Sequence, residues 1–210
     1  MIRTIVAIAF AAILVGCAGR LTYTGPAVQQ AGAHDKTLNQ PFDRAWAASI
    51  QSFERHNLVV ASMDRAAGVV SLDLTGNPER YLDCGQVESM VVNPRSPARR
   101  IYQFPAASGH QVYEQLMRGN LYEVDRRLEL GGAINVIFQR DGRNRTRVTV
   151  NTLYQLTRTI HVGNVVGRHY EPVSDTIAFT TSSRGTFPGF EQSTQCIANG
   201  QLEKEILGLL

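Results

Sequence analysis

The sequence predicts a single α+β domain in which an antiparallel β-sheet carries an N-terminal and a C-terminal helix on one face. Alternating apolar and polar residues recur in several long runs, which is typical of half-buried strands. Two stretches, residues 41–56 and those after about 199, instead repeat apolar residues every three or four positions, as amphipathic helices do. The apolar and charged fractions, 43% and 19%, are those of an ordinary globular chain, and they exclude a disordered tail protein and a polytopic membrane protein.

The first seventeen residues have the order of a secretory signal peptide. A basic residue precedes an uncharged apolar run, and the run ends in Leu14-Val15-Gly16-Cys17, which resembles a bacterial lipobox. We therefore expect cleavage after Gly16 and acylation of Cys17. The alternative is a short membrane helix, but a span needs about 18 apolar residues, and a polar segment starts at Gly19. Ala18 stands where an aspartate would resemble an inner-membrane retention signal, so the expected location is the periplasmic side of the outer membrane.

Three segments are expected along the chain. Residues 1–16 form the lipoprotein signal peptide, residues 17–40 a lipidated flexible tether, and residues 41–210 the α+β periplasmic domain. The middle segment is rich in Gly, Ala, Gln and Thr and has no clear periodicity. As a flexible coil it would reach roughly 27 Å, enough to hold the domain clear of the lipid head groups.

The domain is expected to open with a helix at residues 41–56, where Pro41 suits the first turn. Trp46, the only tryptophan, lies on the apolar stripe of this helix, and we expect it in the core and not at a ligand site. The other expected elements, in chain order, are a hairpin of 58–63 and 68–74, a strand at 87–92, a short helix at 106–117, strands at 121–130, 133–139, 145–160 and 175–181, and a closing helix from about 199.

Cysteine usage points to one disulfide. If Cys17 is acylated, only Cys84 and Cys196 remain, and an even pair in an exported protein is most simply a bridge. Both lie beside turn residues, so the bridge is expected to tie the turn after the first hairpin to the segment that precedes the closing helix. Two buried free thiols are the alternative.

The sequence contains no recognised motif for catalysis, for a cofactor or for a metal. The chain has no G-x-S-x-G elbow, phosphate-binding loop or dinucleotide-binding fingerprint. No pair of histidines has the spacing of a helical zinc site, although His161 and His169 flank one loop with Glu171; the full set is His34, His56, His110, His161 and His169. We therefore expect a protein that is not an enzyme and that holds no cofactor or metal.

Arginines form the one candidate binding surface. Arg140, Arg143, Arg145 and Arg147 follow one another around a predicted hairpin turn, and an earlier loop contains Arg95, Arg99 and Arg100. Such a patch could face the phosphates of lipopolysaccharide or phospholipid, or an acidic protein partner. The favoured alternative is a solvated turn whose charges discourage edge-to-edge aggregation. The net charge of +3 does not argue for nucleic acid.

The order of elements behind the lipobox resembles the helix-grip domains of outer-membrane lipoproteins of the BamC type. The residues that carry the resemblance are the helix start at residues 41–46, the hairpin around Gly68, Asp83-Cys84-Gly85, and Cys196 shortly before 200–203. The resemblance implies a helix-grip fold at the outer membrane. We expect a non-catalytic accessory or binding module with an envelope protein as its partner. A carrier of an apolar or lipid ligand between helix and sheet is the second expectation, and an envelope hydrolase the third.

Overall fold

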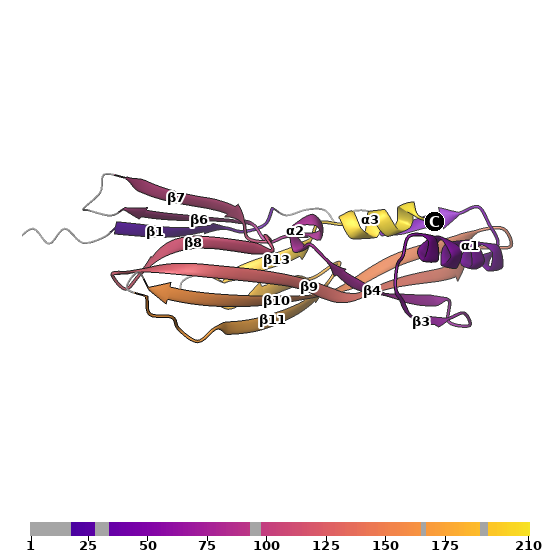
Figure 1. Cartoon of the computed structure of the whole chain (residues 1–210). Coiled ribbons are helices and arrows are strands. Elements are labelled where there is room, and N and C mark those ends of the chain that lie inside the picture. The colour runs from indigo at the N-terminus through magenta and orange to yellow at the C-terminus, as the bar shows by residue number, and fades with distance from the viewer. Residues whose placement is uncertain (1–17, 28–33, 93–97, 165–166, 190–192) are drawn as a thin grey trace, which may run out of the picture.

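The computed structural model describes residues 18–27, 34–92, 98–164, 167–189 and 193–210. The chain is mostly β, with 60% of it in strands and 15% in helices. Figure 1 shows an elongated molecule in which one long twisted sheet runs from end to end. Shorter strands and the helices lie along one side of this sheet.

The long sheet is built on two strands, β9 (Asn120–Arg140) and β10 (Thr146–Asn164). They pair antiparallel from the hairpin turn at one end of the molecule to Tyr122 opposite Asn164 at the other. Five shorter strands complete the sheet. Beside β9 lie β8 (His110–Met117) and β4 (Val69–Gly76), which pairs in turn with β3 (Val60–Asp64); beside β10 lie β2 (Asp35–Leu38) and β11 (Val173–Thr180).

Two small sheets and three helices make up the rest of the described fold. The second sheet has the order β1 (Ala18–Thr24), β6 (Gln86–Val92), β7 (Arg99–Pro105), and the third has the order β12 (Arg184–Phe187), β13 (Thr194–Ala198), β5 (Leu82–Asp83). The helices are α1 (Phe42–Arg55), α2 (Pro78–Tyr81) and α3 (Gln201–Gly208). In Figure 1 the second sheet lies over one end of the long sheet, while α1 and α3 lie toward the other end.

The main core lies against the inner face of the long sheet. Because successive strand residues point to opposite faces, alternate residues of β10 from Val148 to Leu156 are buried together, as their alternation predicts. Trp46 lies in this core, where its ring is 5.9 Å from that of Phe42 and 5.3 Å from that of Phe138 on β9. Its predicted role as a core residue agrees with these contacts.

The predicted α+β class is wrong, because the molecule is built of three sheets with little helix. One cause is the predicted helix at 106–117, where the structure has strand β8. Val112 is exposed, while Gln115 shares the buried face with Tyr113, so apolar and polar residues do not alternate as in a typical half-buried strand. A two-residue turn at Arg118 and Gly119, both with positive φ, joins β8 to β9.

The second difference lies in the segment expected to be a flexible tether. Residues 18–24 form β1, which pairs with β6, and residues 35–38 form β2, which pairs with β10. The expectation of an unstructured coil is therefore wrong for these two strands. Both are edge strands with several exposed residues, so their sequences do not show the alternation that marks a strand with one buried face.

The third difference concerns the two strands predicted at 121–130 and 133–139, which are one continuous strand, β9. Gly131 and Gly132 lie inside it, although glycine pairs more often mark a turn. Gly132 has a φ of 139°, and a Cβ at this position would be 2.0 Å from the carbonyl oxygen of Leu153 on β10. Gly132 thus permits a close approach of the two longest strands.

This geometry predicts a large difference between two neighbouring glycines. Gly132→Ala should lower the free energy of unfolding by about 2 kcal/mol or more, because the new methyl group meets the β10 backbone and the φ is unfavourable for alanine. Gly131→Ala is the matched control, since its Cβ would have only an ordinary contact, 3.8 Å from the carbonyl oxygen of Leu74. Urea denaturation of both variants measures the difference. Equal stability would contradict the described approach of β9 and β10.

Candidate functional site

Cys17, the residue expected to be acylated, lies outside the described residues. The structure begins at the next residue, where β1 pairs with β6 from Ala18 opposite Val92 to Thr24 opposite Gln86. Figure 1 shows the start of β1 at the end of the molecule that is remote from α1. A group attached at position 17 is therefore one residue away from a paired strand at one tip of the fold.

The four arginines of the predicted anionic-partner patch gather around the β9–β10 hairpin, at the same end of the molecule as α1. Three of the four make contacts within the chain. The guanidinium of Arg140 lies 4.2 Å from the centre of the Phe42 ring, and ion pairs join Arg145 to Asp141 and Arg147 to Asp35. The four predicted residues are Arg140, Arg143, Arg145 and Arg147. The contacts of three of them within the chain favour a solvated turn over a surface that binds a partner.

A second group of arginines lies at the opposite tip, where β1 begins. The ends of three other strands also lie at this tip: Val92 ends β6, Asn120 begins β9 and Asn164 ends β10. Arg95 lies outside the described residues. The exposed arginines of this tip are Arg20, Arg99, Arg100, Arg118 and Arg168. The loop arginines and the hairpin arginines of the sequence prediction are thus at opposite ends and do not form one surface.

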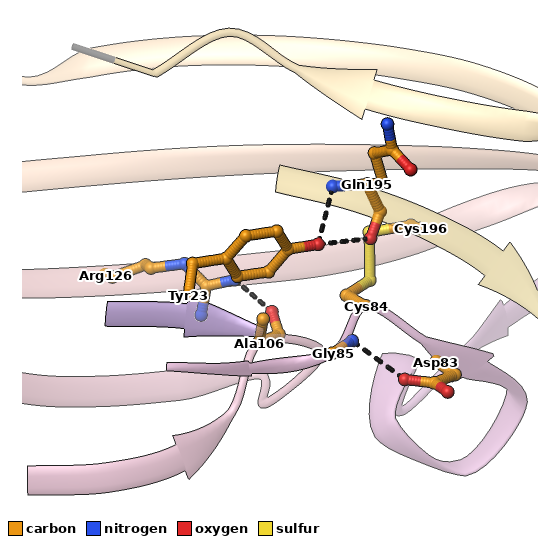
Figure 2. The surroundings of a disulfide bond; sticks show 8 residues. All are labelled: Tyr23, Asp83, Cys84, Gly85, Ala106, Arg126, Gln195 and Cys196. Atoms are coloured by element: carbon orange, nitrogen blue, oxygen red, sulfur yellow. Dashed lines mark hydrogen bonds between the residues drawn. A yellow bond between two sulfur atoms is a disulfide. The ribbon is translucent and has the colours of Figure 1, made fainter. Parts of the chain in front are cut away.

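The predicted disulfide joins Cys84 to Cys196, with an S–S distance of 2.05 Å and 4.0 Å between the Cα atoms. Both cysteines are buried in the main core. Cys196 lies within strand β13 and not in a loop, and Cys84 directly follows β5, the partner strand of β13. Figure 2 shows the bridge where the third sheet meets β1 and the turn before β6, at the edge of the second sheet.

Tyr23 of β1 fastens the N-terminal strand beside this disulfide. Its phenol donates a hydrogen bond to the carbonyl oxygen of Gln195 at 3.1 Å and accepts one from the amide of Gln195 at 2.9 Å (Figure 2). Burial raises the pKa of Tyr23, so the phenol keeps its proton. The neighbouring Gly85 has a φ of 77°, and a Cβ there would be 2.0 Å from the carbonyl oxygen of Thr24. β1 therefore docks closely against the turn that carries Cys84.

Two buried arginines lie near the same junction, and sequence reasoning missed them. Arg126 of β9 is 6% exposed, and Arg158 of β10 is 9% exposed. Arg158 donates two hydrogen bonds to Asp175, of 3.0 and 2.6 Å, and a third to the carbonyl oxygen of Pro188. Arg126 donates to the carbonyl oxygen of Ala106, as Figure 2 shows. The sequence did contain a signal for them, because each arginine lies two positions from apolar residues of its strand and therefore shares their inward face.

A groove beneath α3 has a largely apolar lining. Its volume is about 360 Å³, and Arg80 and Glu205 form an ion pair of 2.8 Å among its lining residues. Burial raises the pKa of Glu205, but hydrogen bonds from Gln201 and Arg80 outweigh it, so the net shift is downward. The apolar lining consists of Leu58, Leu74, Ile134, Leu202, Ile206 and Leu209. The groove is thus beneath the C-terminal helix, not beneath the helix of Trp46.

A buried carboxylate holds α3 against the long sheet. Glu203 is fully buried and accepts hydrogen bonds of 2.8 Å from the hydroxyls of Tyr154 and Thr181. Burial, followed by the negative charge of Glu203, raises the pKa of Tyr154. The other carboxylate oxygen, Oε2, has no hydrogen-bond partner in the described part of the chain. This cluster fixes the helix that forms one wall of the groove.

Neither a metal-binding cluster nor a membrane-spanning helix is found in the described part of the chain. Within it, no three side chains of His, Cys, Asp or Glu are grouped so that they could hold a metal ion. His169 bridges to Gly163 through the backbone, and Nε2 of His110 is within hydrogen-bond distance, 3.0 Å, of a carboxylate oxygen of Asp125. Among the helices of the described residues, none is long and apolar enough to cross a membrane.

The disulfide predicts a stability loss that can be measured in a Cys17→Ser chain, which has no other free cysteine. Replacing Cys84 and Cys196 with serine removes a link between residues that are 112 positions apart. We expect the free energy of unfolding to fall by about 4 kcal/mol, because the unfolded chain gains conformational entropy. Thiol titration of the unfolded Cys17→Ser chain should detect no thiol before reduction and two after it. Two thiols before reduction would contradict the bridge.

Comparison with known proteins gave no relative for this chain. No family model, no curated protein and no solved structure matches it.

Proposed function

We propose that the protein is a non-catalytic lipoprotein, held by an acylated Cys17 at the periplasmic side of the outer membrane, where it acts as an accessory or binding module. The observation that carries the proposal is the position of β1. A strand that begins at residue 18 and is fixed in the fold leaves no slack between an acyl group at residue 17 and the folded body. An anchor there would set the orientation of the whole molecule.

The charges of the N-terminal tip fit this orientation. Its five exposed arginines would lie beside the lipid head groups, whose phosphates attract cations. Only one of them is paired with a carboxylate in the described part of the chain, since Arg100 forms an ion pair with Glu114. A membrane-facing role for these arginines replaces the patch that the sequence suggested at the β9–β10 hairpin.

The opposite end of the molecule would then point away from the membrane. β9 has 21 residues, so at about 3.3 Å per residue it spans roughly 65 Å. Helix α1, helix α3 and the β9–β10 hairpin lie toward this remote end (Figure 1). The edge strand β3 is also there, and it exposes Met63 and the adjoining Val59. An exposed edge with apolar side chains is a surface on which a protein partner can add a strand.

A carrier of apolar or lipid ligands is the second candidate, and the groove beneath α3 favours it. The volume of about 360 Å³ is within the range of small-molecule pockets. If the protein is a carrier, native mass spectrometry of the Cys17→Ser chain mixed with a C16 fatty acid should show one bound molecule. Leu74→Trp should abolish binding by filling the groove, while Val112→Trp, on an exposed strand position, should not. Equal binding by both variants would reject the carrier.

The lipid anchor is tested by the location of the protein in cells. Cys17→Ser should move most of the protein from the outer-membrane fraction to the soluble periplasmic fraction, because the acyl chains supply the membrane affinity. Immunoblotting of fractionated cells measures the change. An unchanged membrane fraction would contradict the proposal.

Two variants serve as controls for this experiment. The double change Cys84→Ser and Cys196→Ser also removes cysteines but should leave the protein in the membrane fraction. Ala18→Asp should shift the protein toward the inner membrane, since the aspartate would restore a retention signal of the enterobacterial kind. Retention of Ala18→Asp in the outer membrane would contradict the sorting argument alone, and not the acylation.

A further inference from the structure

Arg126 is a buried cation whose donors are not all used. It lies between β8 and β10, opposite Gln111 on one side and Ile160 on the other. One terminal nitrogen donates to the carbonyl oxygen of Ala106, whereas the other, Nη1, is buried and has no hydrogen-bond partner among the described residues. An unused donor of a charged group in the interior costs free energy, because water no longer solvates it.

The charge of Arg126 is not balanced by the described groups around it. The charged or titratable groups that act on it are Arg158, Asp175 and Tyr113. Both oxygens of Asp175 already accept hydrogen bonds from Arg158. Burial raises the pKa of Tyr113, so its phenol stays neutral. Among the described residues, two guanidinium groups therefore share one carboxylate, and one positive charge between the sheets has no counter-charge.

Arg126 remains a cation at neutral pH. Burial lowers its pKa to about 10, which is still well above the pH of the periplasm. An unpaired buried charge is strongly destabilising, so a long strand would not be expected to keep one without a compensating group. The guanidinium has a planar donor edge that suits oxygen anions.

We propose that Nη1 of Arg126 is the anchor of an anion-binding site, which takes a carboxylate or a phosphate group between the long sheet and the small sheets. Arg158 adds a second positive charge, while Asp175 keeps that arginine in place. Apolar side chains adjoin the site on the side of the second sheet, where Phe104, Tyr113 and Val124 form a separate buried cluster. Such surroundings exclude water and strengthen the attraction between the arginines and an anion. The site does not depend on the lipid anchor.

A carboxylate of the chain itself is the competing source of negative charge. Glu191 lies outside the described residues, three positions after Pro188, whose carbonyl oxygen accepts a hydrogen bond from Arg158. The Glu191→Gln variant separates the two cases. If the bound group is external, this variant should respond to added anions as the unmodified chain does.

Inorganic phosphate is the first probe, and the full-length mature protein in a neutral detergent is the sample. Its melting temperature should rise saturably with phosphate, compared with sodium chloride at the same ionic strength, by about 5 °C at 100 times the Kd. Equilibrium dialysis with radioactive phosphate should find one bound ion per chain. Dialysis needs no variant, so its result does not depend on how a substitution affects folding. If neither phosphate nor the amphiphilic anions described below bind saturably, the proposal is overturned.

Substitution of Arg126 tests the site itself. Arg126→Met should abolish the phosphate response and leave the melting temperature in chloride unchanged or higher, since it removes an unpaired charge. A purely structural arginine would instead give a lower melting temperature in chloride. Arg127→Met is the matched control, because Arg127 is exposed on the other face and pairs with Asp125. An equal loss of response in both variants would show nonspecific binding and overturn the proposal.

Four probes decide the source of the anion. Two small anions, phosphate and acetate, are compared with two amphiphiles, decanoate and a short-chain phosphatidic acid, in the unmodified chain and in Arg126→Met. If all four probes raise the melting temperature, a free anionic group is sufficient for binding. If only the two amphiphiles raise it, the bound group is a lipid head group. A response that appears only in Glu191→Gln would mean that the chain supplies its own counter-ion, and this overturns the proposal.

Discussion

The pairing of β9 with β10 is the constraint on which the rest of the molecule depends. It runs from Arg140 opposite Thr146 to Tyr122 opposite Asn164, so these two strands define the length of the fold. Every other strand of the long sheet except β3 hydrogen-bonds directly to one of them. The inner face of the pair supplies apolar residues along one part and two arginines along another. A single ladder thus supports both the core and the proposed anion site.

The sequence predicted correctly those features that depend on nearby residues or on residue counts. The alternation in residues 145–160 predicts the inner face of β10, and the even pair of cysteines predicts the disulfide between Cys84 and Cys196. It failed where the burial of a residue is decided by distant parts of the chain. On β8, Gln115 is buried beside Tyr113 while Val112 is exposed, so the apolar residues do not alternate, and their spacing led to a predicted helix. That helix was one cause of the wrong fold class.

The candidate sites also divide into features that follow from nearby residues and features that depend on distant parts of the chain. The four arginines of the β9–β10 hairpin are close together in sequence and in space, but their contacts with Phe42, Asp35 and Asp141 were not predictable from spacing. Arg126 and Arg158 are 32 positions apart by their numbers, yet they come together because β9 and β10 fold back on each other. A charged residue in a strand is usually taken to face solvent, which hides arginines that point inward.

The docking of β1 also bears on how the molecule would respond to force. β1 runs from the tip of the fold inward, and its seven residues pair antiparallel with β6. A pull on the N-terminus along the long axis would load these hydrogen bonds together in shear, and would not open them one after another. Tyr23 and the close approach at Gly85 hold the inner end of the strand, so they would add resistance to sliding. With the proposed anchor at Cys17, β1 would be a joint that carries tension along the long axis of the molecule.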